Sequence, residues 1–259
     1  MKVLDLFSGI GGFALGLEAA GFETAAFCEI DPYAQKVLKK NWPGVPIYED
    51  VRRITADRLV SDGIGVDVIT GGFPCQDVST AGRQAGIDGE RSGLWSECSR
   101  LLGDIRPRYA IFENVTNLLA GDGGDWFKRV LWDISTVGYD AEWHCIPASA
   151  VGAHHHRDRV WIVALNGEAQ PLADSSSKGL QGGQEARNNG KDRQEPRNQL
   201  ITGLGGVQGG AWEAEPNVGR VANGVPARSH RLRCLGNAVV PQIPELIGRQ
   251  IMEAERGGA

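Results

Sequence analysis

The stretch VLDLFSGIGGFALG (residues 3–16) begins with apolar residues, passes through closely spaced glycines and continues as a mainly apolar segment. It predicts a strand over 3–7, a tight turn and a helix over roughly 11–20, because glycine adopts turn conformations that other residues avoid. A turn of this kind also lets a ligand come close to the backbone. Strand, glycine turn and helix in this order indicate an α/β protein.

Working outward, the same alternation continues to about residue 165 and favours βαβ units that build a parallel sheet. We expect further strands at 24–30, 66–71, 109–115 and 159–165, and helices from Pro32, at 93–104, at 124–137 and from about Gln242. Residues 166 to about 228 are rich in Gly, Gln, Asn, Ser and Arg, which is typical of loop-rich or partly disordered sequence. The pattern predicts an α/β body, a polar insertion and a closing segment that returns to the body.

The glycine turn and the two strand ends that follow it point to a nucleotide-like ligand. Gly9 and Gly11 fit the loose fingerprint of dinucleotide-binding turns, and Glu29 ends the second expected strand. A carboxylate at that point can accept hydrogen bonds from both hydroxyls of a ribose. Asp50, in IYEDV (47–51), is well placed for an adenine amino group. These residues leave NAD and S-adenosylmethionine equally open as cofactors.

The stretch GGFPCQ (71–76) puts a cysteine directly after an apolar strand, at the sheet edge where α/β proteins bind ligands. Pro74 restricts the chain there, so Cys75 is placed as a nucleophile would be. The alternative is that Cys75 is a small buried hydrophobic residue, which is the common fate of a lone cysteine. The other thiols fit that alternative better: Cys28, Cys98, Cys145 and Cys234.

Two further segments carry polar groups at strand ends. Glu113, in FENVTN (112–117), follows an apolar run and can act as a general acid if burial raises its pKa. Arg157 and Arg159 share one face of the strand that they enter and can reach the same anionic or carbonyl-rich substrate. The histidines at 154–156 alternate in direction, so we expect no metal site.

Composition limits the class of protein. The chain has 259 residues, a net charge of −5 and five widely spaced cysteines without a C-x-x-C pair, which argues against a disulfide framework or a zinc cluster. No signal-like or membrane-spanning apolar segment is visible, so we expect a soluble, unexported protein of the cytoplasm or nucleoid. Only residues 166–233 contain more basic than acidic residues, which allows a local basic face on an acidic body.

The motifs DLFSGIGG, GGFPCQ, ENV, R-x-R before a strand and LGNAVVPQ occur here in the order found in DNA (cytosine-5) methyltransferases. The chain resembles a small bacterial or phage-type member of that family over about 1–165 and 231–252. The resemblance implies a Rossmann-like S-adenosylmethionine-dependent sheet, with a catalytic domain over 1–165, a target-recognition region over 166–230 and a returning segment over 231–259.

Carried over residue by residue, the resemblance makes Cys75 the nucleophile and Glu113 the acid on the target ring, with Arg157 and Arg159 positioning these groups and the base. One departure is His155, which stands where the family usually has glutamine; an imidazole still donates and accepts one hydrogen bond. The cofactor residues would be Phe7, Gly9, Gly11, Glu29, Ile30, Asp50, Val51, Pro74 and Asn237.

The implied substrate is cytosine in double-stranded DNA, flipped out of the helix, with the polar segment after Cys75 acting as a loop that closes over it. We expect a monomer, with a cognate restriction endonuclease as a partner. The expected DNA-binding residues are Gln76, Ser79, Arg83, Arg187, Arg193 and Arg197.

Two other functions compete with this one. A tRNA cytosine-5 methyltransferase shares the same core and catalytic residues. A nucleotide-dependent thiol oxidoreductase fits Gly9, Gly11, Glu29 and Cys75, but it leaves the joint presence of GGFPCQ, ENV and LGNAVVPQ unexplained. A relic that binds DNA without catalysis would lack a catalytic residue, and none is missing.

Overall fold

Apolar strands from the first 166 residues form the centre of this computed structural model, which describes residues 1–74, 93–167 and 228–257. The strands are β1 (Lys2–Leu6), β2 (Glu23–Cys28), β3 (Ile47–Tyr48), β4 (Val68–Gly72), β5 (Tyr109–Val115), β6 (Tyr139–Pro147) and β7 (Asp158–Asn166). The helices are α1 (Gly12–Ala19), α2 (Pro32–Asn41), α3 (Ala56–Ser61), α4 (Gly93–Ile105), α5 (Asn117–Ala120), α6 (Asp125–Thr136), α7 (Arg228–Asn237) and α8 (Gln242–Gly257). Three short 3-10 turns complete this part: η1 (Val51–Arg53), η3 (Gly121–Gly124) and η4 (Ala148–Val151).

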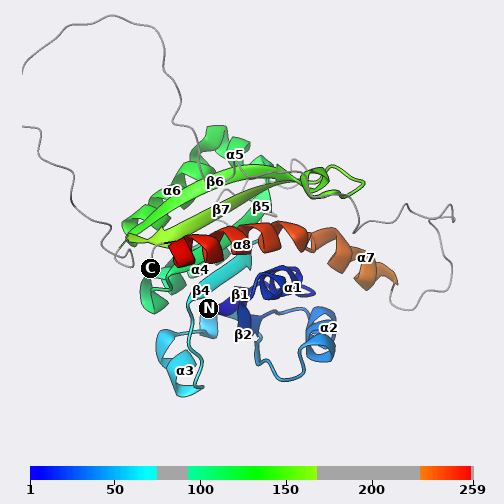
Figure 1. Ribbon diagram of the computed structural model, residues 1–259, viewed down its shortest axis with the longest axis vertical. Helices are drawn as coiled ribbons and strands as arrows, with labels where there is room; N and C mark the ends of the chain where they lie inside the picture. Colours follow the sequence, from blue (N-terminus) through cyan, green and yellow to red (C-terminus); the bar gives the residue numbers. More distant parts are fainter. Residues whose placement is uncertain (75–92, 168–227, 258–259) are drawn as a thin grey trace, which may run out of the picture.

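The strands form one sheet in the order β3-β2-β1-β4-β5-β7-β6 (Figure 1). β1 to β5 pair in parallel, as the βαβ pattern predicts. The expectation of a wholly parallel sheet is wrong, because β7 runs antiparallel to both β5 and β6. The physical reason is the short connection from Pro147 to Asp158, which suits an antiparallel pair but is too short for the crossover that a parallel pair needs.

The sequence patterns miss β3, β6, α3, α5 and α7. β6 lies at the edge of the sheet and exposes Glu142, Trp143 and Cys145, so its apolar alternation is broken. α7 buries none of its described side chains and therefore lacks the apolar periodicity by which a helix is recognised. The other expected strands and helices are present, with ends that differ by one or two residues.

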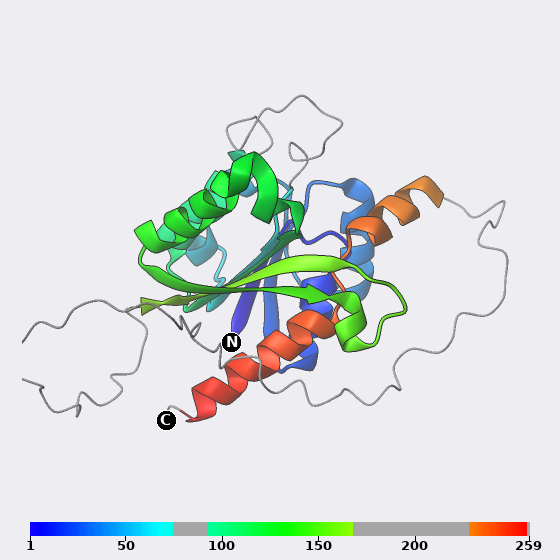
Figure 2. The same cartoon turned by 90° about the horizontal axis from the view of Figure 1, so that it is seen from above.

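Helices cover both faces of the sheet (Figure 2). On one face, Trp95 and Leu101 of α4 and Val130 of α6 pack with Phe112 of β5 in the larger apolar core. The opposite face is covered by α1 and α8, whose apolar residues meet Trp161 of β7 in a second core. The buried residues of α8 in that core are Ile243, Ile247 and Ile251.

Helix α8 can approach α1 closely because of Gly16. A Cβ atom at that position would lie 2.1 Å from the carbonyl oxygen of Pro241, so any side chain would push the two helices apart. Arg249 also donates a hydrogen bond to the carbonyl of Ala19 at 3.3 Å. The C-terminal segment is thereby packed against the first helix of the chain. None of the helices described is long and apolar enough to cross a lipid bilayer.

Candidate active site

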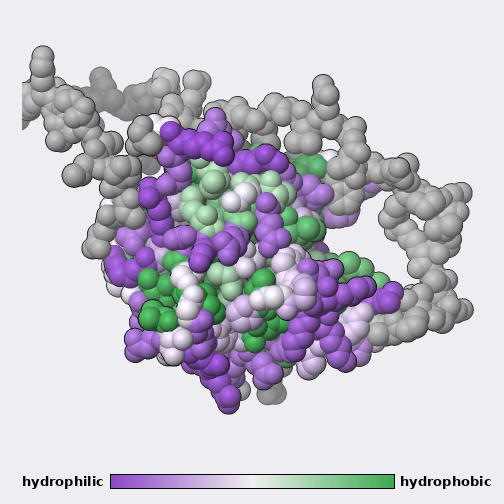
Figure 3. Space-filling view, turned by 60° about the horizontal axis from the view of Figure 1, so that its bottom comes forward, coloured by the Kyte–Doolittle hydropathy of each residue, from purple (hydrophilic) through white to green (hydrophobic). Residues whose placement is uncertain are grey.

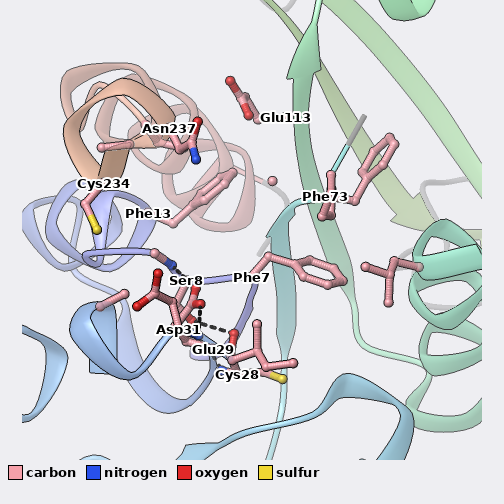
Figure 4. A pocket seen from close by; sticks show the side chains of 18 of the residues that line it. Phe7, Ser8, Phe13, Cys28, Glu29, Asp31, Phe73, Glu113, Cys234 and Asn237 are labelled. Carbon is pink, nitrogen blue, oxygen red and sulfur yellow. Dashed lines mark hydrogen bonds between the residues drawn. The ribbon is translucent and has the colours of Figure 1, made fainter. Parts of the chain in front are cut away.

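A cavity of about 960 Å³ lies at the edge of the sheet where the parallel strands end. β1 and β4 are neighbours in the sheet, but the chain runs outward from β1 to β2 and from β4 to β5. Ligands of α/β proteins bind at such a reversal of strand order. The residues predicted from sequence that line it are Phe7, Gly9, Glu29, Ile30, Asp50, Val51, Pro74, Glu113, Arg157, Arg159 and Asn237 (Figure 4).

The turn after β1 forms part of the cavity wall. Phe7 has a φ of 53° and Gly9 a φ of 54°, and the first of these values is unfavourable for a residue with a side chain. The hydroxyl of Ser8 holds the turn by donating to the carbonyl of Asp5 at 2.6 Å and accepting from the backbone N–H of Cys28 at 3.2 Å. A strained backbone that its surroundings hold in place is common at ligand sites.

Gly11, which the sequence assigns to the cofactor, is placed by the structure in a close packing contact. The structure places it at the N-cap of α1 with a φ of 88°, outside the described cavity lining. A Cβ atom here would lie 2.6 Å from the side chain of Trp42. In this structure Gly11 therefore permits the close packing of α1 against the end of α2.

Glu29 is held by backbone groups on both sides. Its Oε2 accepts a hydrogen bond from the N–H of Gly9 and its Oε1 accepts one from the N–H of Asp31, each at 2.7 Å. The side chain is 9% exposed and faces the cavity. Each carboxylate oxygen keeps a second acceptor site, so Glu29 can receive the two hydroxyls of a ribose.

Asp50 follows β3 and caps η1, where its Oδ1 accepts from the N–H of Arg52 at 3.0 Å. The guanidinium of Arg52 also binds both carboxylate oxygens, and these hydrogen bonds lower the pKa of Asp50. Asp50 is consequently an ionised acceptor. Ile30, 70% exposed at the cavity, provides an apolar surface on which a flat ring can lie.

On the other side of the cavity, Glu113 and Arg159 form an ion pair, with 2.9 Å between Oε1 and Nε. The antiparallel direction of β7 explains this contact, because it brings the beginning of β7 next to the end of β5, where Val115 pairs with Arg159. Glu113 is 8% exposed. Burial raises its pKa, while the charges of Arg159 and Arg157 act in the opposite direction.

Arg157 contacts the last turn of α7. Its Nη1 donates to the carbonyl of Gly236 at 2.6 Å, next to Asn237 in the cavity wall. Burial, followed by the neighbouring charge of Arg159, lowers the pKa of this guanidinium. Arg157 therefore links the start of β7 to the LGNAVVPQ segment across the mouth of the cavity.

Asn114 lines the cavity, although the sequence patterns assign it no role. It is 3% exposed, and its Nδ2 donates to the carbonyl of Phe73 at 3.1 Å. Phe73 is further held by Trp95, with ring centroids 4.9 Å apart. Asn114 thus fixes the main chain just before Pro74 and Cys75, and its position in the ENV motif is the signal that could have identified it.

Several predicted residues lie outside the described part of the chain: Cys75, Gln76, Ser79, Arg83, Arg187, Arg193 and Arg197. Of the other thiols, Cys28 and Cys98 are buried as expected, and burial raises the pKa of Cys28 to about 12. The expectation of burial is wrong for Cys145, which is exposed on the edge strand β6, and for Cys234, which is half-buried at the cavity. Cys145 lies on an edge strand, and Cys234 lies on a helix that buries none of its described side chains.

Comparison with known proteins identifies the family that this site resembles. Residues 1–206 match the C-5 cytosine-specific DNA methylase family. The chain is 40% identical over 168 residues to the Type II methyltransferase M2.BsuMI of Bacillus subtilis (strain 168), covering 63% of this chain and 42% of that protein. It is 37% identical over 164 residues to M.HgiBI of Herpetosiphon aurantiacus, covering 63% and 37%. The matched region thus spans less than half the length of these relatives.

Solved structures agree with this assignment. A prophage-encoded protein of E. coli, described as a DNA modification methyltransferase, superposes with a TM-score of 0.56 at 28% identity, over 64% of this chain and 47% of that one. The Dnmt2 methyltransferase of S. pombe superposes with a TM-score of 0.51 at 21% identity, over 64% and 49%. The second likeness concerns the fold alone.

Proposed function

This chain belongs to the C-5 cytosine-specific DNA methylase family, and on that basis we propose that it transfers a methyl group to carbon 5 of cytosine in duplex DNA. The observation that carries the proposal is the buried Glu113–Arg159 ion pair, which faces the same cavity as Glu29 and Asp50. One part of this cavity offers acceptors for an adenosine, and the other offers an acid and a cation for a base.

The residues present fit S-adenosylmethionine as the cofactor. Glu29 would hold the ribose hydroxyls, Asp50 the adenine amino group and Ile30 one face of the adenine ring. Gly9, Phe7, Val51, Pro74 and Asn237 would complete this part of the wall. When bound, S-adenosylmethionine supplies an electrophilic methyl group on a sulfonium sulfur.

The chain's own residues would prepare the base. The thiolate of Cys75 would add to carbon 6 of cytosine while ring nitrogen 3 takes the proton of Glu113, which leaves an electron pair at carbon 5 able to accept a methyl group. Loss of the carbon 5 proton and departure of Cys75 would then restore the ring. Burial favours the protonated form of Glu113, and Arg159 holds its carboxyl group in place.

Access to the base requires that it leave the stack, so we propose base flipping into the cavity. We assign the chemistry to residues 1–165 and the choice of DNA sequence to residues 166–230, with 231–259 as the returning segment. Since the relatives are named Type II methyltransferases, we further propose a restriction-modification role beside a cognate endonuclease, with the enzyme acting as a monomer.

A methyl-transfer assay tests the proposal. The protein is incubated with S-adenosylmethionine that carries a labelled methyl group and with either duplex DNA or tRNA. Bisulfite sequencing of DNA from cells that express the protein then locates the modified cytosines. We expect label in DNA and protection at a short recurring sequence. Label in tRNA alone would favour the tRNA enzyme, and no label in either would contradict the proposal.

A further inference from the structure

Helix α7 lies on the surface without a buried apolar face among its described residues. Most surface helices are stabilised by burying an apolar face, but none of the described side chains of α7 is buried, and Leu232 and Leu235 are 58% and 62% exposed. Its sequence, RSHRLRCLGN, carries three arginines and a histidine without an acidic residue. Packing therefore explains little of its composition.

Two side-chain contacts attach α7 to α2. The imidazole of His230 lies on the ring of Tyr33, with centroids 5.5 Å apart, and Arg233 forms an ion pair with Asp31, which caps α2. The two helices consequently lie side by side, as both ribbon views show (Figure 1, Figure 2).

Helix α2 presents lysines on the side that it shares with α7. Residues 3 or 4 positions apart lie on the same helical face, so Lys36 and Lys40 follow Tyr33 along the outer side of α2. Both lysines are exposed, whereas Ala34 and Leu38 are buried on the inner side. Within the described residues, no ion pair joins Lys36, Lys40 or Arg231 to a carboxylate.

We call Lys36, Lys40, Arg231 and Arg233 the basic face. The acidic residue in contact with it in the described structure is Asp31, which is paired with Arg233, so the surface is locally positive on a chain whose net charge is −5. Figure 3, which turns the lower part of the Figure 1 view forward, shows many hydrophilic residues on this face of the molecule. Exposed basic side chains that no described carboxylate neutralises, such as Lys36, Lys40 and Arg231, favour a polyanion as the partner.

The basic face begins at the rim of the cavity. Arg233 lines the cavity itself, and Cys234, Gly236 and Asn237 continue α7 along its wall. Lys36 and Lys40 are one helical turn apart, about 6 Å along the axis. Phosphates occur about every 3.4 Å of duplex axis along each strand, so two side chains at this spacing can meet phosphates of one strand that passes the cavity mouth.

We propose that the basic face binds the sugar-phosphate backbone of the DNA whose target cytosine enters the cavity. This inference rests on the proposed function and adds a location to it: the strand is held by α2 and α7, in addition to any contacts made by the region 166–230. Because phosphate contacts carry no sequence information, the face contributes affinity and orientation rather than the choice of site.

The test uses the full chain and a short duplex of arbitrary sequence, with dissociation constants measured by fluorescence anisotropy over a range of salt concentrations. The first variant combines Lys36→Gln, Lys40→Gln and Arg231→Gln. The matched control combines Lys2→Gln, Lys128→Gln and Arg256→Gln, which removes the same charge from other elements. Calorimetric titration with S-adenosylhomocysteine checks that the cavity of each variant is intact.

Each neutralised phosphate contributes about 0.9 to the slope of log K against log salt concentration, so loss of three contacts should reduce the slope by about 2.7. We expect this reduction in the first variant, with the slope of the control and the affinity of both for S-adenosylhomocysteine unchanged. An unchanged slope in the first variant, or an equal reduction in the control, would overturn the inference while leaving the proposed function standing.

Two other results would also overturn the inference. If the wild-type protein binds no duplex at low salt, the proposed function fails and the inference fails with it. If the first variant loses affinity for tRNA but not for the duplex, the basic face serves RNA, and the inference is overturned.

Discussion

Main-chain N–H groups hold the carboxylates that follow β2 and β3, whereas Glu113, at the end of β5, is held by the side chain of an arginine from another strand. Glu29 accepts from Gly9 and Asp31, and Asp50 accepts from the N–H of Arg52. Glu113 depends on Arg159, 46 positions further along the chain. We call the first region the cofactor half of the cavity and the second the base half.

The difference matches the chemistry proposed for each half. Neutral hydroxyl and amino groups are held well by ionised carboxylates, and the hydrogen bonds of Arg52 lower the pKa of Asp50 accordingly. An acid that must give up a proton is needed in the base half, where burial raises the pKa of Glu113. Substitutions in one half should therefore leave the function of the other intact.

The largest effect is expected for Glu113→Gln. An amide cannot supply the acid proton, so the rate of methyl transfer should fall by about 10²–10⁴-fold, while the affinity for S-adenosylhomocysteine stays at the wild-type value. Glu245→Gln, at a half-buried carboxylate on α8 that pairs with Arg249, is the control and should change neither quantity. If the Glu113→Gln enzyme transfers methyl groups at the wild-type rate, Glu113 is not the acid of the base half.

Asp5, in β1, allows a test through the stability of the fold. It is fully buried, its Oδ1 accepts from the hydroxyl of Thr70 at 2.6 Å, and its Oδ2 has no partner in the described structure. Burial raises the pKa of Asp5 from 3.8 to about 7. The folded state then keeps a proton that the unfolded chain releases between about pH 4 and pH 7.

The free energy of unfolding should consequently fall as the pH rises through that window, by at most about 4 kcal/mol. Asp5→Asn should flatten this dependence, whereas Asp140→Asn, at an exposed position of β6, should not. Denaturant titrations from pH 4 to about pH 8 measure it. A dependence that survives in Asp5→Asn would mean that another group carries it.

In the cofactor half we expect a smaller effect. A ribose hydroxyl or adenine amino group left without its partner costs about 1–3 kcal/mol, so Glu29→Ala and Asp50→Ala should each weaken cofactor binding about ten-fold or more. Glu23→Ala removes a carboxylate from the exposed start of the strand that precedes Glu29 and should have no effect. Calorimetric affinities equal to wild type in both site variants would argue against the assigned roles.

The smallest effect is a change in pH dependence. The single-turnover rate should decline at high pH as Glu113 loses its proton, and Arg159 sets where this happens because its charge lowers the pKa of Glu113. Removing that charge in Arg159→Met should move the decline to higher pH, on top of a lower overall rate. A decline that moves to lower pH would contradict the assigned electrostatics.

The same contrast explains what could be predicted from the sequence. The cofactor half follows from short local signals: a glycine turn and a carboxylate after each of two strands. The apolar run Tyr109–Val115 gave the ends of β5 directly, because a strand buried on both faces needs such a run. Four of the parallel strands, β1, β2, β4 and β5, and the layers of helices follow from the same local patterns.

What could not be predicted depends on contacts between distant segments. The antiparallel placement of β7 beside β5 brings Arg159 to Glu113, and no local pattern encodes that choice. Gly11 fits a ligand-binding fingerprint, yet it packs against Trp42. Helix α7 has no apolar face, and β6 is interrupted by exposed residues because it lies at the sheet edge.

Trapping of the covalent adduct tests the central claim that the base half performs nucleophilic chemistry through Cys75. A duplex with 5-fluorocytosine at the target site permits methyl transfer but not the final elimination, because fluorine replaces the proton that must leave carbon 5. With S-adenosylmethionine, wild type should form a complex that survives denaturing electrophoresis, as should Cys98→Ala and Cys145→Ala. Cys75→Ala should form none, and an adduct in that variant would contradict the account.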